Sequence, residues 1–128
     1  MSIDPSIIAA ICAIPRLSRE SNKSRIELVA DSGYPTIRSS LTAADLRVYL
    51  NDNPGIVNDW EGWSEDKRTS EGWYLSSSGQ GATVGYVGRA DSQVYYQSRV
   101  EACAQFIVYE LGEIASHDGP LRAPPNTR

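Results

Sequence analysis

The sequence has few of the residues that most often carry out catalysis or bind metals. It contains one histidine, His117, and two cysteines, Cys12 and Cys103, which lie far apart in the chain. No group of His, Cys and carboxylate residues has metal-ligand spacing, and the G-x-S-x-G, G-x-G-x-x-G and P-loop patterns are missing. We therefore predict no catalytic residue, no metal and no cofactor. The cysteines are expected to be buried apolar residues, with a disulfide between them as the alternative.

Long apolar runs and basic patches are missing as well. The apolar run at residues 7–14 is too short to cross a bilayer, and Asp4 precedes it where a signal peptide would carry basic residues. The net charge is −4, and the only adjacent basic pair, Lys67 and Arg68, directly follows two acidic residues. An acidic surface repels nucleic acid and attracts basic partners. We expect a cytoplasmic protein that binds neither membranes nor nucleic acid.

The length and composition are those of one globular domain. The chain has 128 residues, of which 41% are hydrophobic and 22% charged, so it is large enough to bury a core without a disulfide or a metal. We predict a single domain over residues 1–116. Residues 117–128 contain Gly119, Pro120, Pro124 and Pro125, and they are expected to form a flexible tail.

Helix-capping signals divide the front half of the chain into short helices. Ser24 and Thr42 each begin a capping-box pattern, in which an acidic residue follows three positions later. Pro15 is expected to end the first helix, and residues 16–23 to form a loop. The predicted helices cover residues 5–14, 25–31, 43–51 and 54–60. A strand is the alternative for residues 25–31, where apolar and polar residues alternate.

Aromatic and β-branched residues dominate the next part of the chain. They predict a β-hairpin across residues 72–88, with a loop rich in serine and glycine at residues 76–81. Trp73 and Leu75 should share one face of the first strand, because side chains alternate along a strand.

The strongest periodic pattern lies near the C-terminus. Apolar residues recur at spacings of three and four from Tyr96 to Ile114 and predict a long helix over residues 92–114. The expected fold class is therefore α+β. It should be mainly helical, with a β-hairpin or small antiparallel sheet between the front helices and the long C-terminal helix.

Residues 59–74 are the most unusual segment, because they contain all three tryptophans together with a run of charges. In the structural interpretation, Trp60 and Trp73 anchor the helix-to-hairpin junction in the core and the charges form a solvated turn. In the functional interpretation the segment is a recognition surface, since Trp, Tyr and Arg dominate binding hot spots. Trp63 would be its central anchor if it is exposed.

Acidic residues are concentrated in the same region. Between positions 45 and 66 the chain carries six of them, against Arg47 as the only basic residue. A helix surface with this balance suits a basic cleft, whereas the plainer interpretation is a soluble face. The predicted partner-binding residues are Asp59, Glu61, Trp63, Glu65, Asp66 and Arg68.

This part of the chain also resembles a known group of proteins. The segment NPGIVNDWEGWSEDKRTSEGWYL, preceded by SGYPTIRSSLTAADLRVYL, resembles small bacterial immunity proteins of contact-dependent and polymorphic toxin systems. The shared features are a helical front half, a W-x-x-[WY]-S-x-D-K-R-x-S-x-G-W-Y junction and a long C-terminal helix, and they cover about residues 24–111. The resemblance implies a protein that binds a cognate toxin domain, for example a nuclease with a basic cleft, and blocks its active site.

Two other functions are alternatives to a toxin inhibitor. One is a small enzyme with a pocket lined by tryptophans and carboxylates, and the other is an adaptor subunit of a larger assembly. The shortage of histidine, of reactive cysteine and of phosphate-binding loops favours binding over catalysis. The sequence leaves the oligomeric state open.

Overall fold

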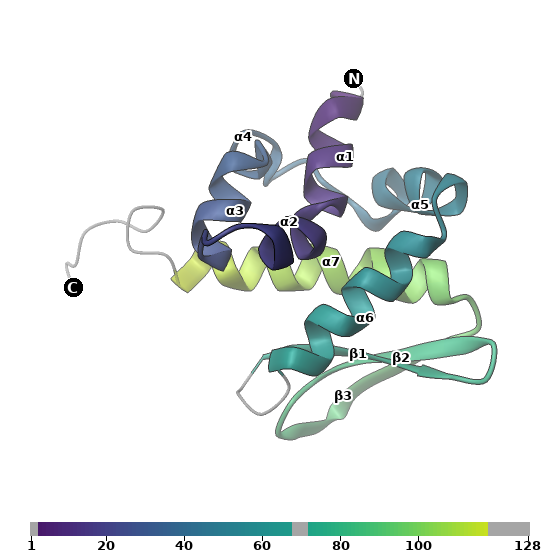
Figure 1. The fold of residues 1–128 in the computed structure, drawn as a ribbon. Helices are drawn as coiled ribbons and strands as arrows, with labels where there is room; N and C mark the ends of the chain where they lie inside the picture. Colours follow the sequence, from purple (N-terminus) through teal and green to yellow (C-terminus); the bar gives the residue numbers. More distant parts are fainter. Residues whose placement is uncertain (1–2, 68–71, 118–128) are drawn as a thin grey trace.

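The front half of the chain folds into short helices, as its capping signals predict (Figure 1). The computed structural model describes residues 3–67 and 72–117 of the protein. The helices of the front half are α1 (Pro5–Cys12), α2 (Ile14–Glu20), α3 (Arg25–Asp31), α4 (Tyr34–Ile37), α5 (Ala43–Asp52) and α6 (Gly55–Lys67).

Two complete capping boxes fix the starts of α3 and α5. The Ser24 hydroxyl accepts a hydrogen bond from the Glu27 backbone N–H (3.1 Å), and the Glu27 carboxylate accepts one from the Ser24 N–H (2.8 Å). Thr42 and Asp45 form the second box, with 2.9 Å between the Thr42 nitrogen and the Asp45 carboxylate. Each box pairs backbone donors that would otherwise lack partners at a helix start. Residues 25–31 are thus a helix and not a strand.

Pro15 does not end the helical region, and the prediction of a loop from residue 16 was wrong. Ala13 links α1 to α2, and Pro15 occupies the first turn of α2. A proline is tolerated there because the N–H groups of the first turn have no partner within the helix. The chain is therefore helical to Glu20, which places Arg16 and Arg19 on α2.

Two helical segments extend beyond the predicted helices. The short α4 follows Gly33, whose φ of 92° is a conformation that glycine adopts readily. Helix α6 continues to Lys67 instead of ending at residue 60. Glu65 therefore lies on a helix and not in a solvated turn.

The predicted hairpin is confirmed and belongs to a three-stranded antiparallel sheet. Its strands are β1 (Trp73–Ser78), β2 (Gly81–Tyr86) and β3 (Arg89–Tyr96), in the order β1-β2-β3. Trp73 pairs with Tyr86, and Leu75 pairs with Val84. The turn between β1 and β2 is shorter than predicted, because the strands extend to Ser78 and from Gly81.

The start of the C-terminal helix was predicted wrongly. Helix α7 covers Arg99–His117, and residues 92–96, which were predicted to form its first turns, belong to β3. Ser98 caps the helix: its carbonyl accepts from the Ala102 N–H (3.0 Å), and its hydroxyl accepts from the Glu101 N–H (3.3 Å). Because helical spacing happens to continue upstream to Tyr96, the periodic pattern alone misplaced this boundary. The helix extends to the first residue of the predicted tail, and residues 118–128 lie outside the described residues.

Helix α7 is the centre of the molecule. It runs between the front helices on one side and the sheet on the other, and it contacts α3, α5, α6 and all three strands (Figure 1). Phe106, Ile107 and Leu111 of α7 are fully buried in one hydrophobic core that includes residues from every other helix and from the sheet. Within residues 3–67 and 72–117, no helix has both the length and the apolar character needed to cross a membrane.

Candidate functional site

The residues predicted to bind a partner do not form one exposed surface. Asp59 of α6 lies against α2, where its carboxylate is 2.9 Å from the Arg16 guanidinium and 3.2 Å from that of Arg19. Its side chain is only 16% exposed. These ion pairs join α6 to α2, so the Asp59 carboxylate is engaged within the protein.

Glu61 is engaged in a second internal network. Arg99 at the start of α7 donates to its carboxylate at 2.8 and 3.1 Å, and the same guanidinium donates to the Asn58 side chain at 2.8 Å. The Ser77 hydroxyl of β1 also donates to the Glu61 carboxylate. Glu61 therefore holds α6, β1 and α7 together.

Trp63 is buried, so the condition for its role as an exposed anchor is not met. Its side chain is 7% exposed and packs beside Trp60, with 5.4 Å between the ring centroids. Its indole N–H donates to the carboxylate of Glu110 on α7 (2.8 Å), which is itself buried. A buried carboxylate needs such donors, because desolvation without hydrogen bonds is costly. Trp60 and Trp63 therefore belong to the core. For Trp60 this agrees with the structural interpretation of the sequence, which placed it in the core.

Of the other predicted site residues, the structure describes the side chain of one. Glu65 is exposed on the last turns of α6. The side chain of Asp66 and all of Arg68 lie outside the described part of the chain. Because arginines from α2 and α7 pair with Asp59 and Glu61, much of the local excess of negative charge is neutralised within the protein.

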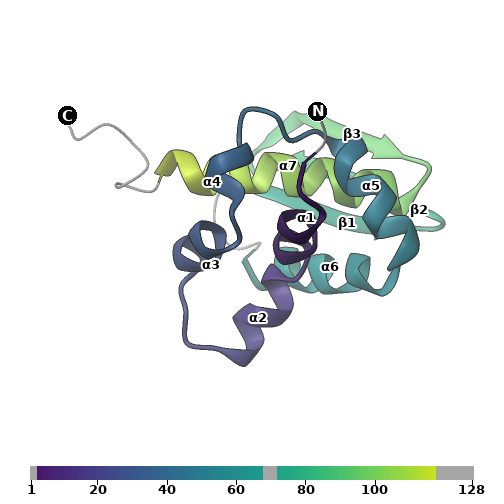
Figure 2. The same cartoon turned by 90° about the horizontal axis from the view of Figure 1, so that it is seen from above.

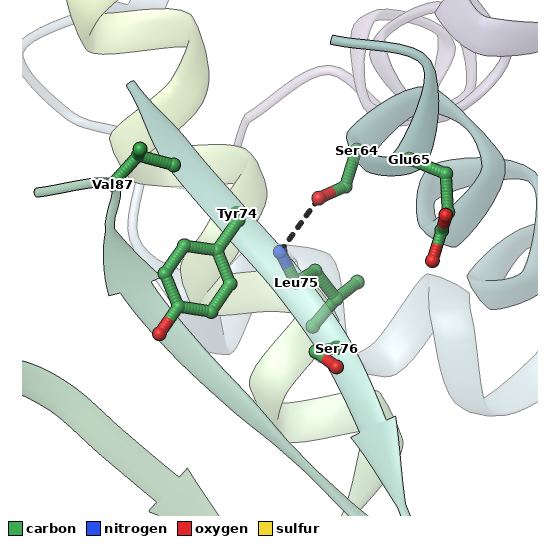
Figure 3. A pocket seen from close by; sticks show the side chains of 6 residues that line it. All are labelled: Ser64, Glu65, Tyr74, Leu75, Ser76 and Val87. Atoms are coloured by element: carbon green, nitrogen blue, oxygen red, sulfur yellow. Dashed lines mark hydrogen bonds between the residues drawn. The ribbon is translucent and has the colours of Figure 1, made fainter. Parts of the chain in front are cut away.

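Glu65 lines a recess at the edge of the sheet (Figure 3). The recess has a volume of about 250 Å³ and opens where α6 passes β1. Its lining residues are Ser64, Glu65, Tyr74, Leu75, Ser76 and Val87. The Ser64 hydroxyl accepts a hydrogen bond from the Leu75 N–H (2.8 Å) and so occupies an outward-facing donor of the edge strand. The lining offers hydroxyls, a carboxylate and apolar walls, which suit a bound side chain.

The recess adjoins a larger surface, the outer sheet face. Helices α6 and α7 pack on one face of the sheet, and no described element crosses the other (Figure 1). The strand register places six polar or aromatic side chains on this open face. They are Tyr74, Ser76, Ser78, Thr83, Gln93 and Tyr95. Tyr74 and Ser76 also line the recess, so the two features form one continuous surface.

Two glycines of β2 fix the tyrosines of the outer sheet face. Tyr74 pairs with Gly85, and a Cβ atom at Gly85 would lie only 2.6 Å from the Tyr74 hydroxyl. A Cβ atom at Gly81 would lie 2.6 Å from the hydroxyl of Tyr95. Real Cβ atoms do not approach so closely, so the rings lie across β2 only because glycine is present. The Tyr74 hydroxyl then accepts a hydrogen bond from the Gln93 side chain (2.6 Å), which links β1 to β3 across the glycine.

The cysteines are free and buried, as predicted. Burial raises the pKa of the Cys12 thiol from its ordinary 9.0 to about 12, and burial raises the pKa of Cys103 well above its ordinary value. Both thiols therefore stay protonated at neutral pH and are poor nucleophiles and poor metal ligands. Within the two described ranges, no three His, Cys, Asp or Glu residues are grouped so that they could hold a metal ion.

The outer sheet face was missed because β3 was assigned to a helix. Two local signals point to it: the β-branched and aromatic run at residues 94–96, and the S-x-x-E capping pattern that begins at Ser98. That pattern is the same as the one at Ser24, which did predict a helix start.

Compared with known proteins, the chain matches no family model, and no curated protein or solved structure is significantly similar to it. The geometry itself therefore carries the functional argument. A flat face of tyrosine, serine, threonine, glutamine and glycine has the composition of protein-recognition surfaces such as antibody loops.

Proposed function

We propose that this protein is an immunity protein, which binds a toxin domain through the outer sheet face and blocks the toxin's active site. The observation that carries the proposal is the composition of this face, with two tyrosines held in place by glycines and surrounded by small polar side chains. The resemblance over residues 24–111 supplies the class of partner. The proposal places the protein in the cytoplasm, where it would protect a bacterial cell from the toxin.

The physical support comes from the energetics of tyrosine at interfaces. A tyrosine side chain has two torsions to immobilise, so it supplies a large contact area at little cost in conformational entropy. Tyr95 is 55% exposed, and its ring rests on Gly81. This ring is already oriented before binding, which lowers the entropic cost of complex formation. The nearby hydroxyl and amide groups can then adapt their hydrogen bonds to the partner.

The net charge of −4 contributes at long range. A negative protein approaches a basic toxin cleft faster than a neutral one, and salt screens this effect. The carboxylates of Asp59 and Glu61 stabilise the fold, so we no longer expect them to make direct contacts with the toxin. Among the predicted residues whose side chains the structure describes, Glu65 is the exposed one, and it lies beside Tyr74 at the recess.

The decisive experiment is co-expression with the toxin domain encoded by the neighbouring gene. The protein should restore growth and co-elute with the toxin on gel filtration. Failure to restore growth, together with the absence of a complex, would refute the proposal. If the protein instead cleaves or chemically modifies the toxin without forming a complex with it, that result would favour the enzyme alternative.

Variants of the outer sheet face then test the location of the interface. Tyr95→Ala should raise the dissociation constant about 30-fold, which corresponds to about 2 kcal/mol for a hot-spot side chain. The matched control is Val48→Ala, which removes an apolar side chain of similar exposure on α5, on the other side of the molecule (Figure 1). Equal affinities for the two variants would place the interface elsewhere. Glu65→Lys should slow association and weaken its dependence on salt.

A further inference from the structure

The two edges of the sheet differ in how they are covered. The edge formed by β1 lies beside α6, and Ser64 accepts the hydrogen bond of the Leu75 N–H. The edge formed by β3 lies on the side of the sheet away from α6 (Figure 2). Among the described strands, β3 has a neighbour on one side only. An open edge is a template for pairing with another strand, and proteins usually cover or disrupt it.

The strand register shows which backbone groups β3 presents at this edge. In an antiparallel pair, residues alternate between facing the neighbouring strand and facing away. The Leu75 N–H points away from β2, so its partner Val84 directs its N–H and C=O groups toward β3, where Val84 pairs with Val94. Val94 therefore faces β2. The N–H and C=O groups of Gln93 and Tyr95, on either side of Val94, point to the open edge.

The side chains at this edge are also accessible. Val94 is 51% exposed and Tyr95 is 55% exposed, although the two residues lie on opposite faces of the sheet. The irregularity in the pairing of β2 with β3 lies between Val84 and Tyr86, which pair with Val94 and Arg89, so it affects residues 90–93 of β3 and leaves the pairing of Val94, Tyr95 and Tyr96 regular. Residues 92–96 contain no proline, lysine or other charged residue. They thus lack the prolines and charged side chains that often keep an edge strand from pairing.

We propose that β3 pairs with β3 of a second copy of this chain, antiparallel about a twofold axis at Val94. In this register Gln93 lies opposite Tyr95 of the second copy, and the outward N–H and C=O groups of both residues bond to each other. The two Val94 side chains meet at the axis. The two sheets become one six-stranded sheet, and the two outer sheet faces become one continuous surface.

Two observations favour a second copy over a different occupant. The edge is self-complementary. The register that pairs the outward N–H and C=O groups of Gln93 and Tyr95 also brings Val94 of one copy against Val94 of the other. The edge is also uncharged over residues 92–96, so two acidic molecules can meet there without like charges in contact. A basic toxin gains no electrostatic advantage at such an edge. Pairing along one short strand buries less than the roughly 800 Å² per partner of a standard stable interface, so dimerisation should depend on protein concentration.

The first test is a disulfide cross-link at the twofold axis. Opposed residues of a non-hydrogen-bonded pair have Cα atoms about 4.5 Å apart, within the range that a disulfide spans. Val94→Cys should therefore form a covalent dimer under mild oxidation, while the buried Cys12 and Cys103 stay unreactive. The matched control is Val48→Cys, since Val48 is 65% exposed on α5. Cross-linking should be at least tenfold faster at position 94, and equal rates at the two positions would overturn the proposal.

The second test uses the unmodified chain in sedimentation equilibrium from micromolar to millimolar concentration. The apparent mass should rise from 14.0 kDa toward twice that value. Val94→Lys places two like charges at the axis and should remain a monomer with unchanged circular dichroism. A mass of 14.0 kDa at every concentration, or a dimer unaffected by Val94→Lys, would overturn the proposal. Neither test needs the toxin, so its result is independent of the immunity function.

Discussion

Reversing the charge of Glu61 should destabilise the protein and not merely change its surface. In Glu61→Lys the carboxylate that accepts hydrogen bonds from Arg99 and Ser77 is replaced by a cation beside Arg99. A hydrogen bond to a charged group contributes about 1.5–3 kcal/mol. Side-chain exposures of 21% for Glu61 and 37% for Arg99 place this network in the lower half of that range.

The total effect follows from adding the new repulsion. Two like charges about 4 Å apart in a partly solvated site repel by about 1 kcal/mol or more. The free energy of unfolding should therefore fall by about 3 kcal/mol, out of the 5–15 kcal/mol typical of a domain. For a domain of this size, that loss lowers the Tm by about 10 °C.

Urea and thermal denaturation measure this loss, and two variants serve as controls. Glu61→Gln keeps the shape and an acceptor oxygen, so it should lose only about 1 kcal/mol. Glu20→Lys makes the same change of net charge at an exposed position on α2 and should be nearly neutral. If Glu61→Lys unfolds at the same urea concentration as Glu20→Lys, the network does not hold the three elements together and the reasoning fails.

Three further predictions concern the sheet, the thiols and metals. Gly85→Ala should displace the Tyr74 ring and break its hydrogen bond to Gln93, with a loss of about 1–3 kcal/mol in stability and a change in the tyrosine resonances seen by NMR. Burial raises the pKa of Cys12 to about 12, so from about pH 9 the thiol ionises in the unfolded chain but not in the folded one. The free energy of unfolding should therefore fall as the pH rises from about 9 to 12. In Cys12→Ala this fall, measured relative to the variant's own value at pH 7, should be smaller. EDTA should leave the Tm unchanged, since the described residues offer no group of three metal ligands; a drop of several degrees would reveal a metal site.

Local signals made the helical front half predictable from sequence. The capping boxes at Ser24 and Thr42 act over four residues, so the sequence contains the whole motif. Pro15 was ambiguous in the same local sense, because proline both ends helices and begins them. The start of α7 was harder to predict, because the residues upstream of Ser98 fit both helical spacing and strand alternation. The capping pattern at Ser98 favours the strand, because it places the helix start after these residues.

The predicted site failed for a different reason, which is distance along the chain. Asp59 pairs with Arg16 and Arg19, which are 43 and 40 residues away, so a charge count over neighbouring positions does not include them. In the same way Glu61 pairs with Arg99, 38 residues away. Sequence composition shows that carboxylates are concentrated near α6, but only the fold shows which of them are paired. The outer sheet face depended in turn on recognising β3.

The central position of α7 has a consequence for synthesis of the protein. Every other described element precedes α7 in the chain, so each of them leaves the ribosome before the helix against which the core closes. Until Phe106, Ile107 and Leu111 are available, the apolar faces of the front helices and of the sheet have no common partner. Folding therefore has to wait until α7 has been synthesised. Chains that terminate before α7 should therefore expose the apolar residues of their front helices and sheet to proteases.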